Sequence, residues 1–113
     1  MSQITTHVLD TSKGQPAAGI SVTLQKPDGS GQWHSLSQGI TDSDGRVSDL
    51  LSDTQVLPPG SYRLVFATGP YYKEQNIMGF YPEVSIVFET FDERHYHVPL
   101  LLNPFGYSTY RGS

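Results

Sequence analysis

The sequence contains no cysteine, and this absence excludes several kinds of stabilisation and chemistry at once. Disulfides, thiolate metal sites and cysteine nucleophiles all need that side chain. The lack is compatible with a reducing compartment, where disulfides are rare. Stability must therefore come from packing, and any reactive site must be built from other side chains.

The chain also lacks a run of basic residues and a long apolar stretch. Seven basic and eleven acidic side chains give a formal net charge of −4, so no surface that neutralises nucleic-acid phosphates is expected. No apolar stretch approaches the roughly 20 residues that a membrane-spanning helix needs. We therefore expect a cytoplasmic protein with neither a nucleic-acid nor a membrane partner.

Glycine, proline and aromatic residues are abundant instead, with 11 Gly, 8 Pro, 7 Tyr and 5 Phe. Such a composition favours short strands joined by tight turns. A chain of 113 residues can bury one hydrophobic core but not two. We predict a single all-β domain over residues 1–113.

About eight segments show the alternation or the β-branched and aromatic content of strands. They span residues 3–10, 20–25, 32–40, 46–50, 62–67, 83–91, 95–102 and 107–111. Their spacing is typical of a β-sandwich. One short helix is expected from Thr68, as its cap, with Pro70 in the first turn. Pro99 lacks an N–H and indicates an edge strand or a bulge.

Four histidines are the side chains best suited to proton transfer near neutral pH: His7, His34, His95 and His97. For His34 and His95, an ordinary half-buried role is the simpler interpretation. His95 and His97 share one face of their predicted strand, a spacing that metal sites also use. No third ligand is evident nearby in sequence, so we predict no metal.

A guanidinium is expected near these imidazoles. The Asp-Gly turn before Arg46 supplies the positive φ of a tight turn and places Arg46 at the start of a strand. With His7 and His97, Arg46 suits attack by an activated water, in which imidazole takes the proton and guanidinium stabilises the developing negative charge.

The chain ends on a polar tail, Tyr110-Arg111-Gly112-Ser113, that directly follows a strand-like run. A guanidinium offers fixed donors, and a glycine lets the backbone approach a ligand closely. We interpret the tail as an ordered wall of the site rather than as a solvated end.

Four stretches carry a family resemblance. They are Thr6-His7-Val8-Leu9-Asp10-Thr11, Asp44-Gly45-Arg46, His95-Tyr96-His97-Val98-Pro99-Leu100-Leu101 and Tyr107-Ser108-Thr109-Tyr110-Arg111-Gly112-Ser113. Together they resemble the transthyretin-related 5-hydroxyisourate hydrolases over the full length of the chain. The closing Tyr-Arg-Gly-Ser is the most specific element.

The resemblance implies a transthyretin-like two-sheet β-sandwich, assembled as a homotetramer of two dimers with active sites between the dimers. It implies hydrolysis of a small purine-derived substrate, 5-hydroxyisourate, in urate breakdown, with no metal or organic cofactor. It assigns catalysis to His7, Arg46 and His97. It assigns substrate binding to His7, Arg46, Tyr110, Arg111, Gly112 and Ser113.

Two other functions stay open on the sequence. A transthyretin-like carrier would hold a small ligand without turning it over, and a structural or adhesive sandwich would use Arg46 and the tail as ordinary surface. Only an enzyme should lose its function when residues 111–113 are deleted. The sequence leaves open which histidine is the general base.

Overall fold

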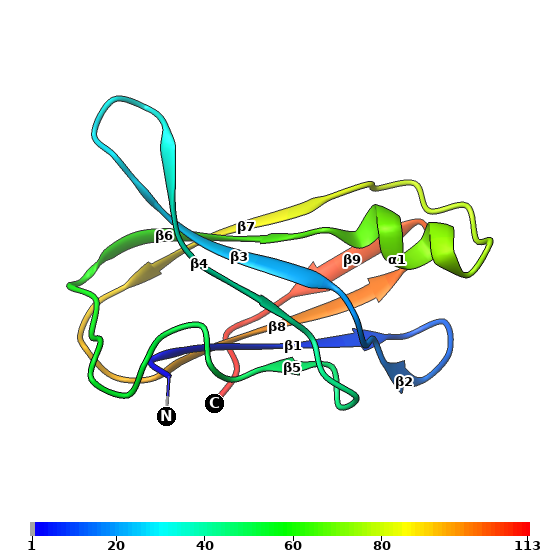
Figure 1. The fold of residues 1–113 in the computed structure, drawn as a ribbon, viewed down its shortest axis with the longest axis horizontal. Helices are drawn as coiled ribbons and strands as arrows, with labels where there is room; N and C mark the ends of the chain where they lie inside the picture. Colours follow the sequence, from blue (N-terminus) through cyan, green and yellow to red (C-terminus); the bar gives the residue numbers. More distant parts are fainter. Residues whose placement is uncertain (1) are drawn as a thin grey trace.

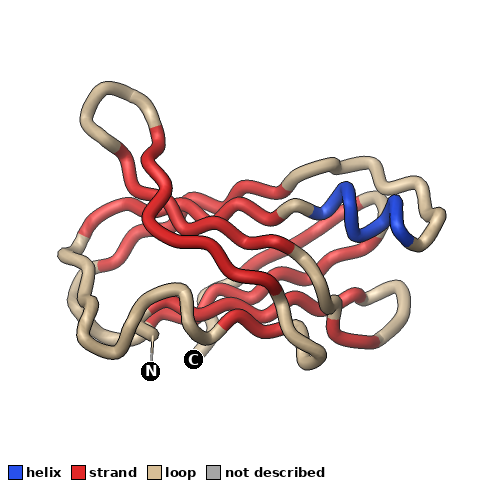
Figure 2. Tube along the Cα trace, in the orientation of Figure 1, coloured by secondary structure: helices blue, strands red, loops and turns tan. Residues whose placement is uncertain are grey.

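The computed structural model describes residues 2–113, and in it two β-sheets pack face to face (Figure 1, Figure 2). The elements are β1 Ile4–Asp10, β2 Gln15–Pro16, β3 Ser21–Pro27, β4 Trp33–Ile40, β5 Arg46–Val47, β6 Gly60–Phe66, α1 Thr68–Glu74, β7 Val84–Thr90, β8 Tyr96–Asn103 and β9 Gly106–Thr109. The predicted sandwich with one short helix is confirmed. The described residues form nine strands rather than about eight, since two-residue β2 lies where only a turn was expected.

The sheet topology brings the two ends of the chain together. One sheet has the order β2-β1-β8-β9, with β5 also paired to β1, and the other has the order β4-β3-β6-β7. β1 and β8 run parallel, with Thr5 opposite His97 and His7 opposite Pro99. β5 runs antiparallel to β1 and places Arg46 opposite His7. In Figure 1, β1, β8 and β5 accordingly lie side by side in the lower layer.

Alternation along β1 separates the core from the outer face. Ile4 and Val8 are fully buried between the sheets, where each buried apolar side chain contributes about 1.5–3 kcal/mol. Thr5 and His7 therefore point away from the core. The same alternation in β8 buries Tyr96 and leaves His97 on the outer face.

Pro99 does not lie on an edge strand, because β8 is paired on both sides. The Gly112 N–H donates to the His97 carbonyl, so His97 directs its backbone groups toward the tail. Residues two apart in a strand direct their backbone groups to the same side, and Pro99 therefore lacks its N–H on the side of the tail. Regular pairing with β9 accordingly stops at Leu100 opposite Thr109. The Thr109 hydroxyl donates to the Pro99 carbonyl over 2.7 Å, which helps to hold the interrupted ladder.

Two local expectations need correction. Thr68 does not cap α1: the N-cap is Ala67, and the Thr68 hydroxyl donates to the Tyr81 carbonyl over 2.8 Å. Pro70 does lie in the first turn, as predicted. The strand expected over residues 46–50 ends at Val47, and it pairs with β1 rather than with the strand before the turn. Within residues 2–113, no helix has the length and apolarity needed to cross a bilayer.

Candidate active site

Three strands place imidazole and guanidinium groups on the outer face of one sheet. Thr5 and His7 come from β1, Arg46 from β5, and His97 from β8. Directly opposed side chains in neighbouring strands lie about 4.5–5.5 Å apart at Cβ, so the register makes these groups neighbours. A pocket of about 200 Å³ is lined by Thr5, Arg46, His95 and His97, among others.

The Thr5 hydroxyl holds His97 in place. Its Oγ1 lies 2.8 Å from His97 Nδ1 and 2.8 Å from His95 Nε2. The two imidazole rings are stacked, with centroids 6.3 Å apart. Thr5 is buried, His97 is half-buried and His95 is exposed, so this network runs from the sheet surface out to solvent.

The pKa of His97 is lowered from its ordinary value. Burial is the main cause, and the positive charges of Arg46, His95 and His7 add to it, because each disfavours a further positive charge on the ring. A lowered pKa keeps the imidazole neutral near neutral pH. A neutral imidazole is the form that accepts a proton from water.

The turn before β5 fixes the position of Arg46. The Asp42 carboxylate accepts hydrogen bonds from the backbone N–H groups of Asp44 (2.9 Å) and Arg46 (3.0 Å), and these bonds lower the pKa of Asp42. Gly45 has φ of 75°, and its carbonyl accepts from the Val8 N–H over 2.7 Å. The turn thereby docks on β1 and presents the exposed Arg46 side chain beside His7.

The tail lies along β8, but its side chains do not all face the pocket. Gly112 forms a bridge with His97, whereas the Arg111 guanidinium lies over the Tyr96 ring, 4.7 Å from its centroid. Arg111 and Tyr110 line a second pocket of about 260 Å³ against β7. Tyr96 points into the core and His97 outward, so within one chain Arg111 and Tyr110 lie on the other side from Arg46. Ser113 is exposed at the end of the chain.

Sequence reasoning missed two members of the cluster. Thr5 received no role, and His95 was interpreted as an ordinary half-buried residue, although it is exposed and bonded to Thr5. One signal was available: Thr5 precedes His7 by two residues and shares its strand face, as His95 does with His97. The pairing of Thr5 with His97 was not visible, because the two strands lie at opposite ends of the chain.

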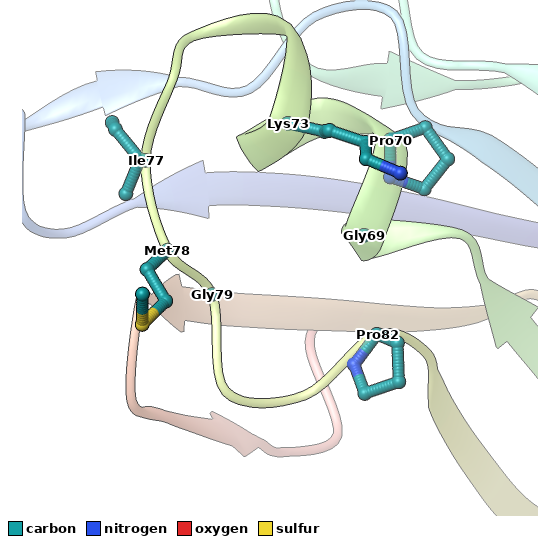
Figure 3. Close-up of a pocket in the computed structure, with 7 residues that line it drawn as sticks. All are labelled: Gly69, Pro70, Lys73, Ile77, Met78, Gly79 and Pro82. Atoms are coloured by element: carbon teal, nitrogen blue, oxygen red, sulfur yellow. The ribbon is translucent and has the colours of Figure 1, made fainter.

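A larger pocket has different chemistry (Figure 3). It encloses about 490 Å³ beside α1, and Figure 3 shows Pro70, Met78 and Pro82 on its walls with Lys73 as the charged group. No imidazole lines it, so volume does not identify the reactive site. Over the described part of the chain, no three histidine or acidic side chains converge as metal ligands.

The fold defines the class of the protein: a β-sandwich of the transthyretin fold. Sea bream transthyretin in complex with thyroxine superposes with a TM-score of 0.90 at 32% identity, covering 98% of this chain and 95% of that one. The chain belongs to the HIUase/Transthyretin family, whose pattern matches residues 4–112.

Relatives within this family carry enzyme names. A probable 5-hydroxyisourate hydrolase of Caenorhabditis elegans is 48% identical, over 99% of this chain and 82% of its own length. The 5-hydroxyisourate hydrolase of Mus musculus is 46% identical, over 99% and 96%. The structure of the Klebsiella pneumoniae 5-hydroxyisourate hydrolase superposes with a TM-score of 0.84 at 35% identity, covering 99% of this chain and all of that one.

Proposed function

We propose that residues 1–113 form one hydrolase domain that opens the ring of 5-hydroxyisourate in urate degradation, giving 2-oxo-4-hydroxy-4-carboxy-5-ureidoimidazoline. The names of the relatives support the reaction. The observation that carries the site is a half-buried imidazole, His97, whose pKa is lowered by burial and which shares a pocket with the Arg46 guanidinium. A general base and an oxyanion donor are thus adjacent.

The proposed reaction is general-base hydrolysis of a cyclic amide. His97 or His7 takes a proton from water, and the water oxygen bonds to the amide carbonyl carbon. Arg46 stabilises the resulting oxyanion. The C–N bond then breaks, the imidazolium returns its proton to the departing nitrogen, and the products carry a carboxyl group and a new N–H.

The tail is proposed to complete substrate binding. Gly112 lies beside His97, and Ser113 follows it at the end of the chain. Tyr110 and Arg111 face the other way within one chain. Their proposed role therefore needs a rotated side chain or a site shared with a second chain.

Turnover of freshly generated 5-hydroxyisourate tests the proposal. His7→Ala, Arg46→Ala and His97→Ala should each lower kcat, by about 10² to 10⁴ for a general base and by about 10² to 10³ for an oxyanion donor. His34→Ala is the matched control, because His34 is exposed on β4 in the other sheet. Near-wild-type turnover in all three site variants would contradict the assignment.

We further propose a homotetramer of two dimers. Both β7 and β9 end a sheet, and both carry exposed apolar side chains at that edge, including Val87 at 59% and Tyr107 at 42% exposure. Unpaired strand edges with apolar side chains favour pairing with another copy. Sedimentation should give a tetramer at micromolar concentration, and a fully active monomer would contradict a shared site.

A non-catalytic carrier is the second candidate. The chain also superposes on a transthyretin in complex with thyroxine, which shows that this fold can hold a small ligand, although the more similar relatives carry hydrolase names. Tight binding of urate-like compounds without acceleration of 5-hydroxyisourate decay would identify a carrier.

A further inference from the structure

Thr5 touches two imidazoles through one hydroxyl group. Its Oγ1 is 2.8 Å from both His97 Nδ1 and His95 Nε2. A threonine hydroxyl has one proton to donate and two lone pairs that accept. If Thr5 donates its proton to one ring, the facing nitrogen of the other ring must be an N–H that donates to the Thr5 oxygen. The protonation pattern of one histidine therefore constrains that of the other.

Two arrangements let Thr5 donate to one ring and accept from the other. In the first, Thr5 donates to His95 and accepts from His97 Nδ1–H, which leaves the lone pair of His97 Nε2 unprotonated. In the second, His95 donates to Thr5, Thr5 donates to His97 Nδ1, and the His97 proton lies on Nε2. Only the first leaves His97 with a basic nitrogen away from Thr5.

The charge around the pocket favours the first arrangement. Arg46 lines the pocket with His97, and its guanidinium carries only donors and a positive charge. The Arg46 charge is close enough to His97 to help lower its pKa, and a nearby positive charge favours a lone pair over an N–H on the ring nitrogen that Thr5 does not contact. Within residues 2–113 no hydrogen bond holds His97 Nε2, so only the Nδ1 side of the ring is fixed by another side chain.

We propose that Thr5 and His95 are positioning residues, which hold His97 in the Nδ1–H tautomer with Nε2 free as the proton acceptor. The proposal rests on the proposed hydrolysis only for its kinetic consequence. Its structural part stands on the two Thr5 bonds and on the Arg46 charge, and it can be tested without substrate.

The ring ¹⁵N chemical shifts of His97, measured by NMR without substrate, report which nitrogen carries the proton. We expect Nδ1–H in the wild type and in Thr5→Ser, which keeps the hydroxyl. In Thr5→Val, which keeps the shape but loses the hydroxyl, the Nε2–H form should rise. His95→Phe should shift His97 in the same direction, because the freed Thr5 proton can then turn to Nδ1.

Turnover is measured on the same proteins. Thr5→Val and His95→Phe should lower kcat by roughly 10- to 100-fold with little change in KM, less than the about 10² to 10⁴ of a whole general base. Thr5→Ser should restore most of kcat. Thr23→Val, on β3 of the other sheet, is the control that should change neither readout.

An Nε2–H tautomer in the wild type, or an unchanged Nδ1–H in both Thr5→Val and His95→Phe, would overturn the proposal. His95 is exposed, so His95→Phe tests the hydrogen bonds through Thr5 even if Thr5→Val does not fold. If the protein does not hydrolyse 5-hydroxyisourate, kcat is absent in every protein while the NMR result is unaffected. Failure of the proposed hydrolysis and failure of the proposed positioning of His97 are therefore distinguishable.

Discussion

The backbone N–H of Gly112 donates to the carbonyl oxygen of His97 over 2.8 Å, and the glycine lies directly against the imidazole. A Cβ added at Gly112 would fall 2.7 Å from His97 Cδ2 and 3.1 Å from Pro99 Cγ. The end of the chain thus packs on the ring that Thr5 holds from the Nδ1 side.

Gly112→Ala should therefore disturb His97 without unfolding the protein. The new methyl group must displace either the ring or the tail, and a shift of about 1 Å in a reacting group can lower kcat/KM by roughly 10²-fold. The free energy of unfolding should change by less than about 0.5 kcal/mol, because the tail is at the chain end. Gly106→Ala is the control, since its Cβ would meet nothing closer than 3.6 Å. Equal activity of the two variants would show that the contact with His97 has no role.

Gly45→Ala should both destabilise the fold and displace Arg46. Gly45 has φ of 75°, and an added Cβ would lie 2.4 Å from the Val8 carbonyl oxygen. Gly14→Ala is a matched control, because Gly14 has φ of 64° but no atom within 4 Å of such a Cβ. Gly14→Ala should cost about 1–2 kcal/mol from backbone strain alone. Urea unfolding should show a larger decrease in the free energy of unfolding for Gly45→Ala than for Gly14→Ala. Similar decreases in the two variants would exclude the clash with β1.

The lowered pKa of His97 predicts how activity and stability depend on pH. An imidazole in the unfolded chain takes up its proton near pH 6.5, where the folded His97 is less protonated because its pKa is lower. The unfolded state therefore binds more protons below that pH. The contribution of His97 to stability is fully present above about pH 6.5 and is lost as the pH falls toward the folded pKa. The same group should give kcat/KM an acid limb with its midpoint below about 6.5.

Arg46→Gln should raise the pKa of His97, because the Arg46 charge is one cause of the depression. An NMR titration of the His97 ring measures the shift. Lys26→Gln removes a positive charge from β3 in the other sheet and should leave the titration unchanged. If both variants titrate like the wild type, the Arg46 charge has no part in lowering the pKa of His97.

Tyr71→Phe should lower stability through a buried carboxylate. Asp10 is fully buried, and the Tyr71 hydroxyl donates to its Oδ2 over 2.7 Å. Burial raises the pKa of Asp10, but hydrogen bonds from Ser12 and Tyr71 outweigh it and leave the pKa lowered. Loss of a hydrogen bond to a charged group costs about 1.5–3 kcal/mol, measurable by urea unfolding. Tyr81→Phe is the control, because no described residue forms a hydrogen bond with the Tyr81 hydroxyl. An equal decrease in the free energy of unfolding in both variants would assign the effect of Tyr71→Phe to packing.

Much of the fold was predictable from local pattern. Alternation from Ile4 to Asp10 placed Thr5 and His7 on the outer face, and the structure agrees. The edge position for Pro99 was wrong, because the usual rule considers only the missing N–H. In this fold that N–H would have faced the chain terminus, where regular pairing with β9 has already stopped and the Thr109 hydroxyl donates to the Pro99 carbonyl.

The candidate site was predictable as a set of side chains but not as a geometry. The resemblance named His7, Arg46, His97 and the tail, and the structure puts the first three on neighbouring strands. The Arg111 guanidinium instead lies over the Tyr96 ring, while Gly112, the next residue, forms the bridge with His97.

By itself the sequence determined which residues share a strand face, where the chain turns at Gly45, and which family the closing Tyr-Arg-Gly-Ser belongs to. Only the tertiary structure decided that β1 runs parallel to β8 with Thr5 opposite His97, and that one hydroxyl links His95 to His97. The reason is physical. Alternation follows from the geometry of one extended chain, whereas register between distant strands depends on how the whole core packs.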